Sequence, residues 1–453
     1  MEKIISLAKR RGFVFPNSEI YGGLEASYDF GPMGVELARN IKNLWWQEYV
    51  LSRPDIVGLD SAIFMSPQVW EASGHTQEFF DKLLECQKCH QRFPQERIKG
   101  NICPNCGGFL SKPQKFQLML ETFWGPVKDS AHIVYMRPET AQGIFINFKI
   151  VQEVMRLKIP FGIAQIGKAF RNEITVGPFI FRKREFEQME IEYFVTPPKD
   201  KIKTQKSKIK NKNQRVKNNK TPESWYEYWK KERLNWYLKY GIKKENIRLR
   251  EHKKSELAHY ATASADIEYH FPWGWSEIEG IANREDFDLR QHQKQSKKDL
   301  TYTDDKTGEK YLPYVIEPSA GLERPFLAFL LDAYEEEEVR GEKRVVLRLH
   351  PALSPVKAAV FPLKRNEPKL VKKAKEIFRQ LREHLPVIYD DTGSIGRLYR
   401  RQDEVGTPFC VTVDFKTLEK DDVTVRWRDT MEQERVAVAK LVEYLKKQLW
   451  KTC

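Results

Sequence analysis

Cationic, acidic and aromatic side chains alternate along residues 161–194, in a pattern that could bind a charged ligand. The segment is predicted to form two long strands joined by a turn at Gly177 and Pro178. Because side chains of one parity share one face of a strand, each strand should present a polar face. These faces comprise Gln165, Gly167, Ala169, Arg171 and Glu173 on the first strand, and Arg184, Phe186, Gln188, Glu190 and Glu192 on the second. A structural hairpin would be apolar there, so we interpret this hairpin as the floor of a binding site.

Four cysteines form a second group with a recognisable chemistry. Cys86 and Cys89 make one CxxC pair, and Cys103 and Cys106 make another. Two such pairs can place four thiolates at the corners of a tetrahedron, as a structural Zn²⁺ ion requires. Two disulfides would be unusual in a cytoplasmic protein, and redox chemistry would need a single CxxC pair beside a βαβ unit. We therefore predict a closed, structural zinc site.

Further acidic and basic residues are candidates for ligand binding. Glu277 and Glu279 lie two residues apart on a predicted strand, so their carboxylates should point the same way. Together they could bind a hard cation such as Mg²⁺, although exposed pairs of this kind often only add solubility. Glu139 and Thr140 precede a helix, where the ordinary role is a cap, but a carboxylate there can also bind a cationic group. Arg324 is expected at or near the start of another helix.

Hydrophobic periodicity indicates the elements that must position these residues. Helices are predicted near residues 2–11 and over 35–51, the latter with a wide apolar stripe that suits a dimer interface or a core helix. A strand-like segment follows at 56–67, and a helix beginning near residue 221 carries aromatic residues typical of a core. From about residue 345, strands and helices alternate as in a compact α/β domain. The arginines near its strand and helix ends are Arg397, Arg400, Arg401, Arg426 and Arg428.

The charge of the chain is concentrated in one segment. Residues 199–220 hold ten Lys or Arg and one Asp, a net of +9, which leaves +5 of the formal +14 for the other residues. This low-complexity segment is either a solvated linker or a tether for a polyanion such as RNA. No apolar run approaches the roughly 20 residues of a membrane span, and no signal-peptide pattern occurs. A cytoplasmic protein is therefore expected.

Several long motifs resemble those of one family of enzymes. FRNE followed by FRKREFEQME is similar to motif 2 of class II aminoacyl-tRNA synthetases, and GLERPFLAFL is similar to motif 3. Residues 35–67 resemble motif 1, the dimer element, with Pro67 as its proline. RGFVFPNSEIYGGL, VWEASGH, RPETAQGIF, IEPSAGLER and RRQDEVGTPFCVTVD resemble the dimeric type of glycyl-tRNA synthetase. The resemblance extends over nearly the whole chain, apart from 195–222 and the four-cysteine segment.

This resemblance implies an α+β fold class: a class II synthetase catalytic domain over 1–340, built on an antiparallel sheet flanked by helices. A four-cysteine zinc knuckle at 86–106 and a disordered lysine-rich insert at 199–220 would interrupt it. Residues 343–453 would form an α/β anticodon-binding domain. The implied partners are ATP with Mg²⁺, glycine and tRNA(Gly), bound by a homodimer.

The resemblance also implies roles for individual residues. Arg171 on the α-phosphate and Arg324 on the γ-phosphate would be catalytic, with Phe186 stacked on adenine. The ATP site would comprise Arg171, Asn172, Glu173, Phe181, Arg182, Lys183, Arg184, Glu185, Phe186, Glu277, Ile278, Gly321, Leu322, Glu323 and Arg324, with Mg²⁺ at Glu277. The glycine site would comprise Glu139, Phe186, Glu187, Gln188, Met189, Glu190, Glu317, Pro318, Ser319, Ala320 and Gly321. Ser319 would either crowd a β-carbon or cap the next helix. Arg92-Phe93-Pro94 departs from the family's Arg-aromatic-Arg sequence, which argues against a substrate contact there.

Two other functions are compatible with part of this pattern. An accessory protein with the same fold could bind RNA without catalysis, but it should lack Arg171, Arg324 or the carboxylates, all of which are present. Another adenylating or amidating ligase, such as an asparagine-forming enzyme, would not need the C-terminal domain. Neither GxGxxG nor GxxxxGK[ST] occurs, so we expect no Rossmann or P-loop nucleotide site.

Overall fold

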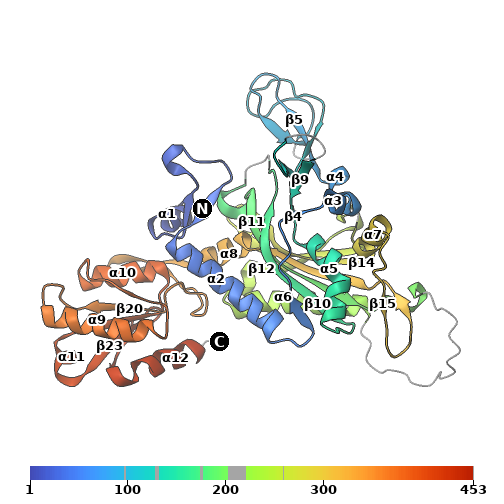
Figure 1. Ribbon diagram of the computed structural model, residues 1–453. Coiled ribbons are helices and arrows are strands. Elements are labelled where there is room, and N and C mark those ends of the chain that lie inside the picture. Colours follow the sequence, from blue (N-terminus) through green and yellow to red (C-terminus); the bar gives the residue numbers. More distant parts are fainter. Residues whose placement is uncertain (96–97, 128–131, 174–176, 203–220, 259, 452–453) are drawn as a thin grey trace.

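The computed structural model describes most of the chain. The described residues are 1–95, 98–127, 132–173, 177–202, 221–258 and 260–451. They form a mixed α/β protein in which one large sheet carries helices on both faces (Figure 1). A small sheet beside the four cysteines projects from one end, and an α/β unit formed by the C-terminal residues lies at one side.

The large sheet has seven strands and provides the framework. Their spatial order is β12 (Ile247–Glu251), β13 (Ala263–Phe271), β14 (Gly274–Glu285), β17 (Tyr314–Gly321), β11 (Glu185–Val195), β10 (Phe161–Phe170) and β3 (Ile56–Gly58). Neighbours are antiparallel except β3, which runs parallel to β10. The predicted hairpin is confirmed as β10 and β11, which pair Phe161 with Phe194 and Phe170 with Glu185. Because β10 ends at Phe170, Arg171 lies in the segment that follows the strand.

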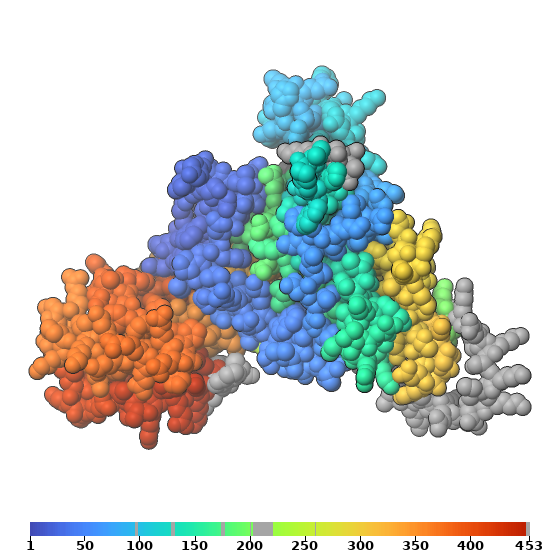
Figure 2. Space-filling view, in the orientation of Figure 1, coloured from blue at the N-terminus to red at the C-terminus, as the bar shows by residue number. Residues whose placement is uncertain are grey.

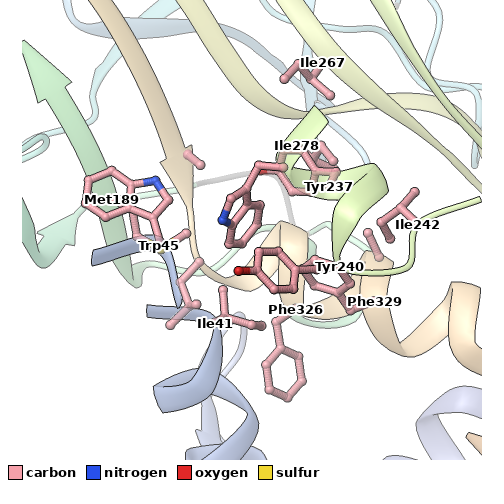
Figure 3. Close-up of a cluster of buried hydrophobic side chains, with 14 of the residues drawn as sticks. Ile41, Trp45, Met189, Tyr237, Tyr240, Ile242, Ile267, Ile278, Phe326 and Phe329 are labelled. Carbon is pink, nitrogen blue, oxygen red and sulfur yellow. The ribbon is translucent and has the colours of Figure 1, made fainter. Parts of the chain in front are cut away.

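One face of this sheet forms the main core. Strand β11 directs Met189, Ile191 and Tyr193 to this face. Helices α2 (Pro32–Trp46), α6 (Pro222–Lys239) and α8 (Glu323–Ala333) cover it. Figure 3 shows side chains from all three helices in one cluster, among them Ile41, Trp45, Tyr237, Phe326 and Phe329. The prediction that the aromatic residues of α6 belong to a core is confirmed.

The other predicted elements of the first 70 residues are present with shifted ends. The opening helix is α1 (Glu2–Arg10), followed by β1 (Val14–Pro16) and β2 (Tyr28–Phe30). The helix predicted over 35–51 is α2 continued by a π-helical turn, Gln47–Leu51. It begins early because Pro32 is preorganised for a first helical turn and lacks the N–H that would be unpaired there. The strand-like segment 56–67 contains β3 and β4 (Phe64–Met65), and Pro67 begins α3 (Pro67–Ser73).

The second face of the large sheet is covered only in part. Helices α5 (Ala141–Val154) and α7 (Phe287–Ser296) pack on one end of it, with the rings of Phe148, Phe161 and Phe194 in contact. The short strands β15 (Tyr302–Thr303) and β16 (Lys310–Tyr311) belong to the same cluster. The rest of this face carries small and polar residues and lines a cavity.

A β-bulge in β14 shows that the predicted common direction of Glu277 and Glu279 is wrong. Two consecutive residues of β13 pair with Glu279 and Glu277, so Ile278 is an extra residue in β14, and the parity of the strand changes there. Glu277 lines the cavity, whereas Glu279 lies on the core face. There Glu279 accepts hydrogen bonds from Nε and Nη2 of Arg233 at 2.6 and 2.9 Å. The two glutamates therefore do not form a joint cation site.

The four cysteines belong to a unit that projects from the large sheet (Figure 1). Its sheet consists of β6 (Arg92–Pro94), β5 (Phe80–Glu85) and β7 (Gln114–Gln117), in that order. A second small sheet, in the order β4, β9 (Ile133–Met136) and β8 (Leu120–Phe123), lies between this unit and the large sheet. Helix α4 (His75–Glu78) follows α3 and leads into β5.

The C-terminal unit has the predicted alternation of strands and helices. Its sheet has the order β21 (Val387–Tyr389), β20 (Ala358–Pro362), β22 (Phe409–Val413), β23 (Asp422–Trp427) and β24 (Gln433–Ala437). Its helices are α9 (Pro368–Arg382), α10 (Ile395–Val405), α11 (Phe415–Lys420) and α12 (Leu441–Lys451). The hairpin β18 (Tyr334–Val339) and β19 (Glu342–Leu347) connects α8 to it. Among the described residues, no helix is both long and apolar enough to cross a lipid bilayer.

Candidate active site

The open part of the second sheet face forms a cavity of about 320 Å³, within the size range of small-molecule sites. Its floor consists of alternate residues from three neighbouring strands: Phe186, Gln188 and Glu190 of β11, Glu317, Ser319 and Gly321 of β17, and Gly280 and Ala282 of β14. The register explains this grouping, because Ser319 pairs with Glu190 on one side and with Gly280 on the other. Of the face that parity predicted as a binding floor, the part on β11 therefore lines the cavity, whereas Gln165, Gly167 and Ala169 of β10 do not.

Arginines and aromatic rings line one part of the cavity. The guanidinium carbon of Arg171 lies 5.2 Å from the ring centroid of Phe186 and 5.4 Å from that of Phe79. Its Nε donates a hydrogen bond to the carbonyl oxygen of Pro138 at 3.0 Å. These contacts hold the planar group against the cavity wall. A guanidinium held in this way can donate paired hydrogen bonds to phosphate oxygens.

Arg324 extends this part of the cavity from the first turn of α8, as predicted. Its guanidinium lies 3.0 Å from a carboxylate oxygen of Glu277 and 4.6 Å from the ring centroid of Phe181. The adjacent Glu323 is buried and pairs with Lys183 at 3.2 Å. Because the start of a helix also carries partial positive charge, this part of the cavity suits a polyanion.

Carboxylates line another part of the cavity. Glu190 accepts hydrogen bonds from the hydroxyls of Ser319, at 2.7 Å, and Thr140. Glu317 accepts one from Nη1 of Arg284 at 2.8 Å. Thr140 is the N-cap residue of α5, as predicted, but its side chain makes no capping hydrogen bond to the helix. Ser319 lies within β17, which excludes the alternative that it caps the next helix.

Burial and the shortage of cations shift the pKa values of these carboxyl groups. Burial raises the pKa of Glu317 well above its ordinary value, although Arg284 acts in the other direction. Burial and the nearby Glu139 raise the pKa of Glu190. Burial alone would also raise the pKa of Glu139, but His75, 3.4 Å away, and Arg284 lower it below its ordinary value. A positively charged ligand group would offset this excess of negative charge.

Arg284 is the central cation among these carboxylates, and it was not predicted from the sequence. It is only 1 % exposed and binds Asp288 through Nε at 2.8 Å and Nη2 at 2.9 Å, in addition to Glu317. Local alternation does not reveal it, because the pairing of β14 with β17 shifts register between Asn283 and Glu285. Other lining residues that the sequence did not indicate are His252, Glu256, Tyr260, Ser264 and Asp266.

Most of the predicted ligand-binding residues are brought together at this cavity. They are Glu139, Arg171, Glu173, Phe181, Arg182, Lys183, Phe186, Gln188, Glu190, Glu277, Glu317, Ser319, Gly321, Glu323 and Arg324. The acidic and basic members come from the three strands β11, β14 and β17, from α8 and from connecting segments. Only the assembled sheet therefore places them within one small volume.

Some predicted ligand-binding residues do not line the cavity. The side chains of Met189, Ile278, Ala320 and Leu322 lie in the main core. Glu185 and Glu187 form ion pairs with Lys168 and Lys42 outside the cavity. The cavity lining also does not include Asn172, Arg184 or Pro318. Because consecutive strand residues point to opposite faces, an unbroken stretch of sequence cannot direct all its side chains into one site.

The four cysteines come together in the projecting unit. Their sulfur atoms lie within 4.8 Å of one another, and the Sγ–Sγ distances are 3.5 Å for Cys86 and Cys106 and 3.7 Å for Cys89 and Cys103. A tetrahedral site with Zn–S bonds of about 2.3 Å has sulfur–sulfur edges of about 3.8 Å. A Cβ added at Gly108 would lie 3.1 Å from Cys86 Sγ, so glycine leaves room beside the sulfur. The cysteine cluster is compatible with a zinc ion.

A basic cleft of about 910 Å³ lies between the C-terminal unit and the hairpin of β18 and β19. Arginines that line it are Arg11, Arg340, Arg397, Arg400, Arg401 and Arg426. Arg426 also binds the buried carboxylate of Asp403 at 2.9 and 3.2 Å. Arg428, another of the arginines noted in the sequence of this domain, is 3 % exposed and binds Asp429, so it is a structural residue. Arg397 is exposed.

Known proteins resemble this chain at the level of one domain and of the whole sequence. The Anticodon binding domain family matches residues 357–448. A glycine–tRNA ligase of Caldanaerobacter subterraneus subsp. tengcongensis is 50 % identical, covering 99 % of this chain and 98 % of its own length. Those of Thermobifida fusca and Streptomyces coelicolor are each 51 % identical, with the same coverage. These matches, together with the cavity and the anticodon-binding unit, define an aminoacyl-tRNA synthetase. The chain belongs to the glycine–tRNA ligase family.

Proposed function

We propose that this chain attaches glycine to tRNA(Gly) in two steps. Glycine and ATP first form glycyl-adenylate with release of pyrophosphate, and glycine is then transferred to the 3′-terminal adenosine of the tRNA. One observation carries the proposal: a single cavity joins an arginine-lined part that suits a triphosphate to a carboxylate-lined part that suits an ammonium group. Membership of the glycine–tRNA ligase family supports it. We infer a class II catalytic core, because the cavity lies on an almost wholly antiparallel sheet.

ATP would bind in the arginine-lined part. Arg171 would contact the α-phosphate and Arg324 the γ-phosphate, while Phe186 would stack on the adenine ring. Carboxylate oxygens are ligands that Mg²⁺ accepts alongside phosphates, and Glu277 with Asp266, which lines the same cavity, fits that requirement. A bound Mg²⁺ would neutralise part of the triphosphate charge.

Glycine would bind in the carboxylate-lined part, with its ammonium group near Glu139, Glu190 and Glu317. The hydroxyl of Ser319 is held by its hydrogen bond to Glu190, so it is placed to crowd a β-carbon. An apolar pocket discriminates weakly against a substrate that is smaller by one methylene. Glycine has no smaller competitor, so steric crowding is sufficient for its selection.

The side chains would catalyse adenylate formation by positioning and charge stabilisation. The glycine carboxylate attacks the α-phosphorus, the bond to the bridging oxygen breaks, and pyrophosphate leaves with the electron pair. In the second step a ribose hydroxyl of the tRNA attacks the carbonyl carbon, and AMP leaves. Arg171 stabilises the negative charge that grows on the α-phosphoryl oxygens, and Arg324 orients the departing pyrophosphate. Neither step requires a protein nucleophile.

Replacing Arg171 by alanine should lower glycine-dependent ATP–pyrophosphate exchange by about 10²–10³-fold, the usual effect of removing one preorganised donor to a developing anion. The measurement is the incorporation of labelled pyrophosphate into ATP. The control Lys158→Ala removes an exposed lysine paired with Asp305 outside the cavity and should keep the wild-type rate. Near-normal exchange in Arg171→Ala would disprove the role of Arg171. A wild-type protein without glycine-dependent exchange would disprove the proposed activity.

The basic cleft beside the C-terminal unit would bind the tRNA, a proposal supported by the match to the anticodon-binding family. Arginines there would contact phosphates and fix the register of the RNA. Contacts between the protein and the RNA bases would give sequence specificity. Arg397→Ala should therefore weaken tRNA binding and reduce its logarithmic salt dependence by roughly 0.7–0.9 per lost contact. Binding titrations at several salt concentrations measure both quantities.

Pyrophosphate exchange by Arg397→Ala should stay at the wild-type level, because Arg397 lines the basic cleft and not the cavity. Arg379→Ala, which removes an exposed arginine of α9 outside the cleft, is the matched control for tRNA binding. Equal tRNA affinity and equal salt dependence in Arg397→Ala and the wild type would contradict the assignment of the cleft.

The four cysteines would hold a structural Zn²⁺ ion through four thiolates. We expect one equivalent of zinc per chain by elemental analysis and its loss in Cys103→Ser. The control Cys410→Ala changes a cysteine of the C-terminal sheet and should keep the metal. Chelation should increase amide exchange within residues 86–106, because the cluster makes up much of the small hydrophobic core there. Unchanged exchange after complete metal removal would contradict a structural role.

A homodimer is the proposed assembly, and an apolar row on α5 supports it. Ile146, Ile150 and Val154 repeat every four residues and are 37 %, 59 % and 72 % exposed, so they form one stripe on the helix. Figure 2 shows the surface of α5 on the same face as α2, the helix of the dimer element. Sedimentation of Ile150→Asp should give a monomer at concentrations where the wild type and the control Glu153→Ala are dimers. A dimeric Ile150→Asp would exclude this stripe as the interface.

Other expectations from the sequence stay predictions. They are the domain limits 1–340 and 343–453 and a cytoplasmic location. The role of the lysine-rich segment 199–220 as linker or RNA tether also stays a prediction, because residues 203–220 lie outside the described part of the chain.

A further inference from the structure

A buried glutamate lies beside the carboxylate-lined part of the cavity without lining it. Glu192 is two residues beyond Glu190 on the same face of β11, toward the end of the strand that α5 covers. It is 0 % exposed and does not contribute to the cavity surface. One carboxylate oxygen from each of Glu190, Glu192 and Glu317 lies within 4.8 Å of the other two. With one of the three fully buried, the ionisation of all three carboxyl groups so close together is strongly disfavoured.

Hydrogen bonding indicates which of the three carries a proton. Glu190 accepts bonds from two hydroxyls, and Glu317 accepts one from Arg284. Within the part of the chain that the structure describes, neither carboxylate oxygen of Glu192 has a hydrogen-bond partner. A buried carboxylate without a donor is strongly disfavoured, so the proton belongs on Glu192.

The charges around Glu192 lead to the same assignment. They are Glu190 on its own strand, Glu317 on β17, Arg284 on β14 and Asp288 on α7, whereas β10 places the apolar Ile163 opposite it. Arg284 is already engaged by Asp288 and Glu317. Burial and the proximity of Glu317 raise the pKa of Glu192 well above its ordinary value.

We propose that Glu192 is a positioning residue of the glycine pocket, which donates a hydrogen bond from its neutral carboxylic acid to Glu317. The register supports Glu317 as the acceptor, since the pairs Glu190–Ser319 and Tyr193–Ile316 place Glu192 opposite Glu317. Among the described residues no donor is recorded for Oε2 of Glu317, whereas both oxygens of Glu190 already accept hydrogen bonds. The bond holds the Glu317 carboxylate in the orientation that receives the substrate ammonium group. The identity of that substrate rests on the proposed function.

The variants Glu192→Gln and Glu192→Leu test whether Glu192 acts as a hydrogen-bond donor or as a negative charge. Glu192→Gln keeps an N–H donor without a charge, so its KM for glycine in pyrophosphate exchange should stay close to the wild-type value. Glu192→Leu removes the donor and should raise the KM for glycine by roughly 10–100-fold, with the KM for ATP unchanged. The control Glu251→Gln changes a carboxylate of the edge strand β12 that pairs with Lys230 on the core side, and it should alter neither value.

Thermal unfolding as a function of pH provides a readout that does not need activity. The pKa of Glu192 is raised in the folded state, so the wild type loses stability from this group as the pH rises above about 4.3, the ordinary glutamate value. Glu192→Gln has no titratable group at this position. The difference between the unfolding midpoint of this variant and that of the wild type should therefore increase with pH. The control Glu251→Gln should not reproduce this trend.

Three results would overturn the proposal. A KM for glycine that rises as much in Glu192→Gln as in Glu192→Leu would show that the charge is required. An unchanged KM in Glu192→Leu would show that the residue only fills space. Parallel pH curves of the midpoint temperature for Glu192→Gln and the wild type would show that Glu192 is ionised in the fold. A wild type without glycine-dependent exchange would instead disprove the proposed function, and the thermal comparison would still decide whether Glu192 is protonated.

Discussion

Side chains of a strand alternate between the two faces of a sheet, and the candidate active site depends on this period. One face of the large sheet must be apolar, because α2, α6 and α8 bury it and bring large aromatic residues such as Trp45, Trp229 and Trp236 into the core. The intervening residues are therefore free to be polar and to face the cavity. The core face holds the strands in register, so the polar residues have defined positions before any ligand binds. Stabilisation of the charge that develops in a transition state requires such preorganised groups.

The carboxylate-lined part of the cavity is governed by the cost of burying charge. Asp288, Glu317 and Glu190 lie near the buried guanidinium of Arg284, which is already engaged by three hydrogen bonds to Asp288 and Glu317. Buried charges must be paired or neutralised, so the excess of carboxyl groups must be balanced by a proton or by a cationic ligand group. Burial, together with the neighbouring carboxylates, raises the pKa of Glu190 and Glu317. The same surroundings would favour an ammonium group over a neutral one. Hydroxyl donors such as Ser319 and Thr140 stabilise the site without adding charge.

The arginine-lined part follows a different physical rule. Arg171 and Arg324 are only partly buried, and each lies against an aromatic ring, Phe186 or Phe181. A ring beside a guanidinium restricts its motion and leaves its N–H donors available for phosphate oxygens. The two parts of the cavity share β11 and β17 as their floor. A reactive carboxylate held at one part would therefore meet a phosphorus atom held at the other without rearrangement of the sheet.

Local patterns in the sequence determined a large share of this description. The two-residue period of residues 161–194 predicted the hairpin and the polar face that includes Phe186, Gln188 and Glu190, and the CxxC spacing predicted that four cysteines would meet. The long motifs indicated the family. These features could be predicted because side-chain alternation and turn geometry are properties of consecutive residues. Only the tertiary structure decided the direction of Glu279, since the bulge at Ile278 arises from pairing with β13. It also decided that Ile278 belongs to the core, and that Arg284 and Glu192 lie beside Glu317. Those positions depend on the register between strands that are far apart in the chain, and no local pattern contains that register.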